Sequence, residues 1–298
     1  MVRALARHAR GHKFKSCIAH FFNPVYMKKI FILLLFFLVA DIFAQSGLRI
    51  KVENNNTGLT ITGSEGRASA LSIPETIDGK NVTIISDGAF IGKGLREVTI
   101  PDSVTVIGDG AFSYNRLTTL TIGNNVTKIG RGAFTSNRLS SVTLGTSVAE
   151  IGKGAFSNNQ IEEITLPASV TTIDDYAFFN NKIKSVEIPA NVTLIGEGAF
   201  SGNKLTSVEV GSSVTTIKDG AFYNNFITSV TIPSSLQNLG ERAFDARSSD
   251  GRIRSNIVFT DAGGNVLYTT ANNFDAFFES NGKKPGKYSL SEGNWKME

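Results

Sequence analysis

One spacing governs most of this chain. The tripeptide Gly-Ala-Phe, or a close variant, recurs with its Phe at intervals of 22 residues and without insertion. The eight positions are Phe90, Phe112, Phe134, Phe156, Phe178, Phe200, Phe222 and Phe244. A unit of this length cannot bury an apolar face alone, so neighbouring units must stack and bury it together. The repeat therefore predicts a solenoid in which each coil contacts only the next.

Apolar residues keep fixed places around each Phe. Aliphatic residues stand five and eight positions before it, as Ile85 and Val82 do before Phe90. After it, an alternation such as Val98-Thr-Ile100 predicts a short strand, and a Pro or Gly then predicts a turn. If these strands pair in parallel, equivalent residues lie about 4.8 Å apart and the Phe rings form one buried spine.

Asparagines follow six of the eight Phe residues at a distance of three positions. They are Asn115, Asn137, Asn159, Asn181, Asn203 and Asn225. We expect their amides to hydrogen-bond the backbone of the next coil, because buried backbone groups need partners. The alternative is that they are ordinary exposed turn residues.

Segments such as Leu205–Phe222 resemble the repeat of the bacterial BspA-like, or treponemal-type, leucine-rich-repeat family, over about residues 71–246. The resemblance implies a right-handed leucine-rich-repeat coil, here of eight 22-residue units with parallel strands, little helix and a cap at each end. It also implies a secreted or surface-exposed bacterial protein that binds other proteins, and no catalytic residues. This chain has Asn where many family repeats have Cys, a difference that leaves the expected fold unchanged.

The repeats divide the chain. We assign residues 73–248 to the solenoid, 45–72 to an N-terminal cap, and 249–298 to a small β-rich C-terminal module. The module is expected to cap the open end of the solenoid; the alternative is a sorting or anchoring signal.

The N-terminal segment is typical of export. Met27-Lys-Lys precedes eleven apolar residues, Ile30 to Ala40, which predicts a signal peptide over 27–44 cut after Ala44. A permanent transmembrane anchor is the alternative, but the run is shorter than a spanning helix needs. Residues 1–26 then represent upstream sequence before a start at Met27. We expect an exported protein without a transmembrane segment, secreted, at the cell surface or associated with the outer membrane, with the periplasm as the alternative.

Composition excludes several functions. Cys17 and the three histidines all lie in the first twenty residues, so the mature chain lacks disulfides, the imidazole base of common hydrolases and the usual zinc ligands. Residues 1–44 hold seven of the 30 Lys and Arg but one of the 26 Asp and Glu, leaving 23 against 25 and a net charge of about −2. We predict no enzyme activity, cofactor, metal or nucleic-acid partner.

Variable outward positions are the candidates for recognition. A cationic row, a pair of carboxylates within a Thr row, and three aromatic residues form the candidate set: Arg116, Arg138, Lys182 and Lys204; Glu187 and Glu209; Phe179, Tyr223 and Phe226. An acidic row precedes the later Phe residues: Asp175, Glu197, Asp219 and Glu241. The alternatives are solubility and charge balance for the charges, and packing under the C-terminal module for the aromatics.

These patterns favour a non-enzymatic protein-binding repeat protein, a bacterial surface adhesin or a host or interbacterial interaction protein. Its expected partner is an extracellular or cell-surface protein, of a host matrix or of another bacterium. A glycan-binding surface protein and a structural envelope component are the alternatives.

Overall fold

The computed structural model describes residues 42–45, 48–227, 229–244, 246–247, 253–254, 256–260, 266–270, 288–291 and 294–297, with side chains for 48–227 and 230–244. All of them belong to the compact unit Asp41–Glu298. The predicted upstream segment and almost all of the predicted signal peptide lie outside the described residues. No described residue forms a helix, and thus none forms a helix able to span a membrane.

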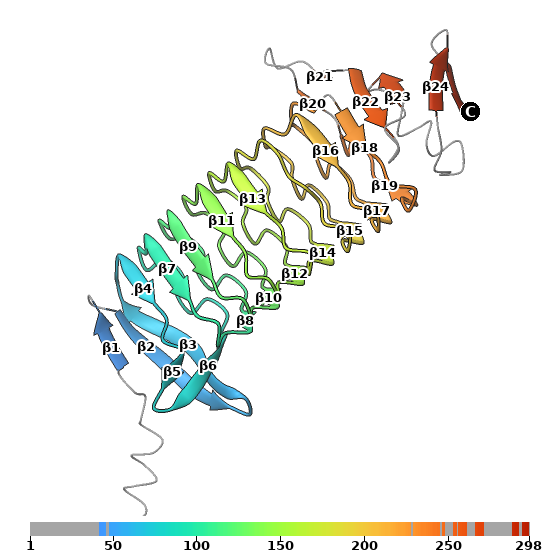
Figure 1. Cartoon of the computed structure of the whole chain (residues 1–298). Helices are drawn as coiled ribbons and strands as arrows, with labels where there is room; N and C mark the ends of the chain where they lie inside the picture. The colour runs from blue at the N-terminus through green and yellow to red at the C-terminus, as the bar shows by residue number, and fades with distance from the viewer. Residues whose placement is uncertain are drawn as a thin grey trace, which may run out of the picture. The chain divides into compact units, whose positions relative to one another are not determined.

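The repeats form the predicted stack of parallel coils (Figure 1). Most coils contribute one short strand to each of two rows of strands. One row belongs to a 12-stranded sheet and contains the pairs of residues just before each Gly-Ala-Phe. After β6 (Lys80–Ile85), its strands are β8 (Val106–Ile107), β10 (Lys128–Ile129), β12 (Glu150–Ile151), β14 (Thr172–Ile173), β15 (Leu194–Ile195), β17 (Thr216–Ile217) and β19 (Asn238–Leu239). Each pairs in parallel with a register of 22 residues, as Lys128 does with Glu150. This row was not predicted, because strands of two residues show no alternation.

The second row contains the strands predicted from the alternation after each Phe. They are β4 (Ala70–Ser72), β7 (Glu97–Ile100), β9 (Thr119–Ile122), β11 (Ser141–Thr143), β13 (Glu163–Thr165), β16 (Ser207–Glu209) and β18 (Ser229–Thr231). The row is interrupted: β13 to β4 form one sheet, and β16 and β18 belong to another. The coil between β13 and β16 has no strand here, only an isolated bridge between Glu187 and Glu209.

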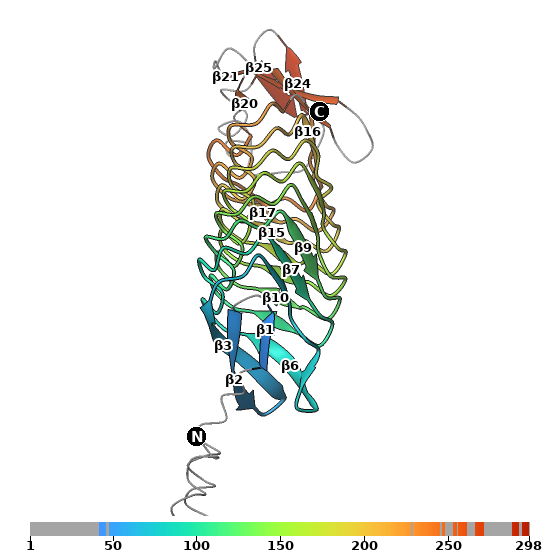
Figure 2. The same cartoon turned by 90° about the vertical axis from the view of Figure 1, so that its left-hand side faces the viewer.

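A β-hairpin begins the described chain. The strands β2 (Leu48–Asn55) and β3 (Gly58–Gly66) pair antiparallel, and β3 joins β6 (Lys80–Ile85) at the start of the first coil (Figure 2). β1 (Ile42–Gln45) lies beside β2, and β5 (Thr76–Ile77) beside β6. The hairpin occupies the region expected to cap the N-terminal end. The predicted cut after Ala44 falls within β1.

At the other end, the sheet of β16 and β18 continues into the C-terminal region. β22 (Asn256–Thr260) pairs in parallel with β18, and β23 (Val266–Thr270) pairs antiparallel with β22. Four further strands lie there: β20 (Ala246–Arg247), β21 (Ile253–Arg254), β24 (Tyr288–Ser291) and β25 (Asn294–Met297). Strands therefore occur in the region predicted to be β-rich, and the division of the chain into modules stays a prediction.

The core is the Phe spine. Seven consecutive ring pairs, from Phe90 to Phe244, stack with centroids 5.1 to 5.4 Å apart and planes within 11° of parallel. All eight side chains are buried, together with the Ala before each and the aliphatic rows. The predicted spine is confirmed, and since burying one large apolar side chain stabilises by about 1.5 to 3 kcal/mol, it is a main source of stability.

The asparagine ladder is confirmed, but its direction is the opposite of the expected one. Asn159 donates from Nδ2 to the carbonyls of Phe134 (3.0 Å) and Phe156 (3.1 Å), and its Oδ1 accepts from Leu139 N (3.2 Å). The bonds therefore reach back to the preceding coil. The other five residues repeat this pattern, and all six are buried. The alternative of exposed turn asparagines is excluded.

Candidate functional site

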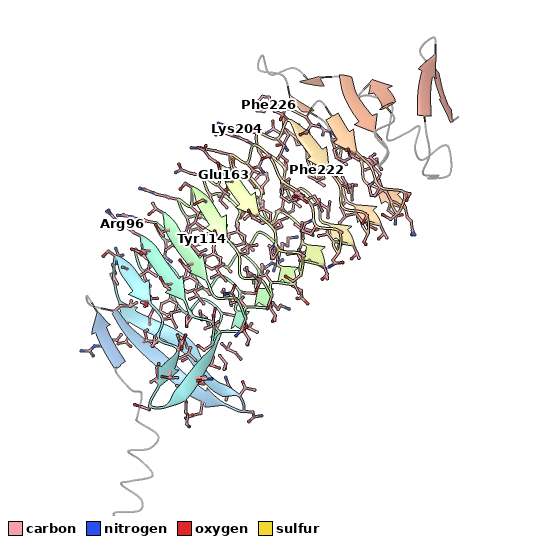
Figure 3. The ribbon with its side chains drawn as sticks, in the orientation of Figure 1. Arg96, Tyr114, Glu163, Lys204, Phe222 and Phe226 are labelled. Carbon is pink, nitrogen blue, oxygen red and sulfur yellow. The ribbon has the colours of Figure 1, made fainter. Side chains whose placement is uncertain are left out.

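One edge of the stack carries a row of cations. Arg116, Arg138 and Lys204 are exposed at the position just before the second strand row. Within the part of the chain that the structure describes, none of the three side chains forms an ion pair or a hydrogen bond with another side chain. Lys182, in the same row, is half-buried and donates to Gln160 Oε1 (3.2 Å). Arg96 is another exposed cation, and it lies two positions later in the repeat than Arg116. Figure 3 shows Arg96, Lys204 and Phe226 along this edge, where the strands of the second row begin.

The most exposed aromatic side chain of the described residues is Tyr114, which the sequence analysis missed. It is 65% exposed, beside a coil whose Ile91 is 49% exposed. Its backbone is left-handed (φ 55°), a conformation that costs a bulky residue free energy. Other coils place Gly, Ser or Asn at this position, as at Gly92 and Asn158. A bulky Tyr at a turn position where other coils have Gly, Ser or Asn was the sequence signal that could have identified this side chain.

Phe226 is the one predicted aromatic anchor that the structure leaves exposed, at 40%. It occupies the same repeat position as Arg116 and Lys204. The cationic row therefore ends in an aromatic side chain at its C-terminal end.

The prediction that Phe179 is exposed is wrong, because Tyr176 packs on it. The two rings meet edge to face with centroids 5.9 Å apart, and Phe179 is half-buried. Lys153 lies 5.5 Å from the Tyr176 ring centroid, and the Tyr176 hydroxyl donates to Glu197. This hydrogen bond, with burial and the nearby carboxylates, raises the pKa of Tyr176 to about 12. Tyr176 also has a left-handed backbone (φ 58°), where four neighbouring coils have Gly.

The prediction that Tyr223 is exposed is also wrong. It is half-buried, and the Arg242 guanidinium lies 4.5 Å from its ring centroid. Tyr176, Glu197, Tyr223 and Arg242 line a shallow cavity of about 260 Å³. These aromatic side chains pack within the coils, so they are not free anchors.

The acidic row joins neighbouring coils. Asp175 pairs with Lys218 (3.0 Å) and Lys153 (3.4 Å), and accepts from Glu197 N (2.9 Å). Burial alone would raise the pKa of Asp175, but the hydrogen bonds from Lys218 and Glu197 N outweigh it and hold the pKa below its ordinary value. Asp219 accepts from Glu241 N in the same way. These carboxylates hold the stack together, so the acidic row is mainly structural.

Glu187 and Glu209 lie elsewhere, on the outward face of the second strand row. Both are exposed, and they are register neighbours across the isolated bridge. In the described part of the chain neither forms an ion pair. They line a groove of about 550 Å³ at the interruption of the strand row, together with Ile164, Leu166 and Val186.

Comparison with family models gives one extended match. The model described as "BspA type Leucine rich repeat region (6 copies)" covers residues 68–184 and 171–292. No curated protein matches the chain.

Solved structures of bacterial repeat proteins are similar. A leucine-rich repeat protein from Bacteroides ovatus is 25% identical with a TM-score of 0.51, over 67% of this chain and 61% of its own. A leucine rich cell surface protein from Faecalibacterium prausnitzii is 26% identical (TM-score 0.42; 68% and 73% covered). The T. pallidum leucine rich repeat protein is 23% identical (TM-score 0.46; 66% and 85% covered). The chain thus spans less than two thirds of the length of the Bacteroides ovatus protein, and the similarity to that structure supports the fold.

Proposed function

Because the chain belongs to the BspA-type leucine-rich repeat family, we propose that it is an exported, non-enzymatic scaffold that binds a protein outside the cell. The partner is a protein of a host matrix or of another bacterium's surface, and the chain acts at the cell surface, associated with the outer membrane, or in secreted form. Adhesion is the role that such binding would serve.

The observation that carries the proposal is the partition of each coil into constant and variable positions. Phe, Ala and Asn at the buried positions are fixed by the stacking contacts, so they carry no information about a partner. The edge positions differ from coil to coil, and there the chain places unpaired cations and exposed aromatic side chains. This edge, defined by Arg96, Tyr114, Arg116, Arg138, Lys182, Lys204 and Phe226, is the recognition edge.

Its composition suits a protein partner with acidic and apolar groups. Arg and Tyr are enriched where interfaces gain most of their free energy, and aromatic side chains contribute when they lose their water. Unpaired cations one coil apart reinforce each other's field and accelerate encounter with an acidic surface.

The proposal is tested by binding of the protein to an immobilised extract of host extracellular matrix. Tyr114→Ser with Phe226→Ser should weaken binding by about 2 kcal/mol, as the loss of hot-spot side chains does. Removing the charges of Arg116, Arg138 and Lys204 should instead slow association and reduce its dependence on salt. The matched control is Thr99→Ser with Thr121→Ser, on the strand face.

Pretreatment of the extract separates the alternatives. Loss of binding after protease digestion supports a protein partner, whereas loss after periodate oxidation with protease resistance supports glycan binding. If the Tyr114→Ser, Phe226→Ser variant bound as well as the wild-type protein, the assignment of the recognition edge would be contradicted. A structural envelope role would instead appear as a fixed stoichiometric complex in the producing cell.

A further inference from the structure

The interruption of the second strand row coincides with a sequence feature. One or two residues after each of these strands from β7 on, and at the equivalent position of the coil without a strand, the chain has Pro or Gly: Pro101, Gly123, Gly145, Pro167, Pro189, Gly211 and Pro233. At Gly123, Gly145 and Gly211 a Cβ would collide with the backbone carbonyl oxygen of the preceding coil. At these three positions the glycine therefore allows its coil to lie close against the coil before it.

Among these coils, Pro167 and Pro189 are the neighbours that are both proline. A single proline at this position does not prevent pairing, because β11 pairs with β13 ahead of Pro167 and β16 pairs with β18 ahead of Pro233. The strand row is interrupted between β13 and the coil that ends at Pro189. Pro74 and Pro101 are also adjacent, but β4 lies at the end of its sheet and has a strand on one side only, so it can adjust.

The interruption exposes part of the apolar layer. Ile164 in β13 is only partly buried, whereas its equivalents Val98, Val142 and Val208 are at most 4% exposed. The resulting groove has an apolar floor of Ile164, Leu166 and Val186. Its rim is polar and consists of Thr165, Ser185, Glu187, Ser207 and Glu209.

The rim carries an uncompensated negative charge. Glu187 and Glu209 are directly opposite each other across the bridge, where like charges destabilise a sheet. Lys184, three residues before Glu187 in the sequence, pairs instead with Glu162 (2.6 Å). A cation between Glu187 and Glu209 would remove this repulsion.

We propose that this groove binds an arginine side chain carried on an extended segment of a partner protein. The aliphatic part of the arginine covers Ile164, and the planar guanidinium donates to the carboxylates of Glu187 and Glu209, which belong to register neighbours. The groove lies five residues along the coil from the cationic row, about 16 Å in extended chain. It is a second site of opposite charge, and it depends on the proposed function only in that a partner supplies the segment.

The experiment uses fluorescent hexa-arginine peptide and measures its anisotropy with the protein. Glu187→Gln with Glu209→Gln should reduce affinity at least about tenfold, as expected when a desolvated charge pair is lost. Glu97→Gln, which removes an exposed carboxylate of the same strand row outside the groove, is the matched control and should leave affinity unchanged. Removing the charges of Arg116, Arg138 and Lys204 should also leave it unchanged or slightly higher, so failure of the recognition edge is distinguished from failure of the groove.

A second variant distinguishes binding in the groove from attraction by the two negative charges alone. Pro189→Gly keeps both carboxylates and lets the coils approach, so it should join the two parts of the strand row and weaken hexa-arginine binding several-fold. Amide hydrogen exchange of Val186 and Ile188 should slow in this variant. Unchanged affinity with slowed exchange, or equal losses in the Glu97→Gln control, would overturn the proposal.

Discussion

Replacing Asn159 by Ala tests the internal ladder most sharply, because each hydrogen bond that it loses is known. The amide of Asn159 is the partner of Leu139 N–H, which is buried without another acceptor in the described chain. The carbonyls of Phe134 and Phe156 each lose one of two donors, since Asn137 and Asn181 still bond them. A third acceptor, Ser157 O (3.3 Å), loses the Asn159 amide but keeps Ser136 N–H. The substitution therefore leaves one donor without a partner and removes one donor from each of three acceptors.

The loss of stability can be worked out from these lost hydrogen bonds. A buried donor without a partner costs about 1 to 3 kcal/mol, and a lost hydrogen bond to a group that keeps another partner costs less. We expect Asn159→Ala to lower the free energy of unfolding by about 2 to 4 kcal/mol, measured by urea denaturation followed by far-UV circular dichroism. Hydrogen exchange at Leu139 should accelerate more than at distant coils, because coils contact only their neighbours.

Asn191→Ala is the control for this prediction. Asn191 is exposed and makes one side-chain bond, to Ala168 O (2.8 Å), so its loss should cost about 1 kcal/mol or less. If Asn159→Ala were as mild as Asn191→Ala, the ladder would not be a source of stability and the reasoning would be refuted.

Two further perturbations test the core and the charges. Phe156→Ala should destabilise by about 3 to 5 kcal/mol in chemical denaturation, as a large core deletion does, and a change below about 0.5 kcal/mol would mean that the spine is not packed as described. Asp175 has a folded-state pKa below its ordinary value of 3.8, so its ionised form stabilises the fold above about pH 4 and that contribution is lost as the pH falls through the folded-state pKa. Asp175→Asn should flatten this part of the acid unfolding curve, and an unchanged acid limb would contradict the ion pairs with Lys153 and Lys218.

The repeat was enough to predict the stack of coils, because only one arrangement buries all of its apolar positions. Eight Phe residues at one spacing, with Ala before each and Asn after most, can be buried together only if the coils are in register. The direction of the Asn bonds was not predictable, since Asn159 could reach the coil on either side and the turn geometry alone decides. The two-residue strands of the first row were missed because parallel pairing forms them, not a local pattern.

The surface was less predictable than the core. Phe179 and Tyr223 were chosen because they replace small or polar residues, but Tyr176 and Arg242, from other positions, pack on their rings. Tyr114 was missed although it, too, replaces the small or polar residue that other coils have at its position. The groove at Glu187 coincides with two prolines in consecutive coils, Pro167 and Pro189, which the repeat pattern displays. That the strand row stops there could not be predicted, because single prolines at the same position leave the strands paired.

Both proposed surfaces require coils stacked in register at one spacing, and a set of spin-label distances tests this most directly. Labels on Thr99→Cys paired with Thr165→Cys, Glu187→Cys or Glu209→Cys are three, four and five coil spacings apart, within residues 45–298, which contain no cysteine. Double electron–electron resonance should give distances that increase by about 5 Å per coil, with Thr99 and Glu209 about 25 Å apart at Cα. Distances that do not grow with coil number, or several populations for one pair, would contradict the stack on which both surfaces depend.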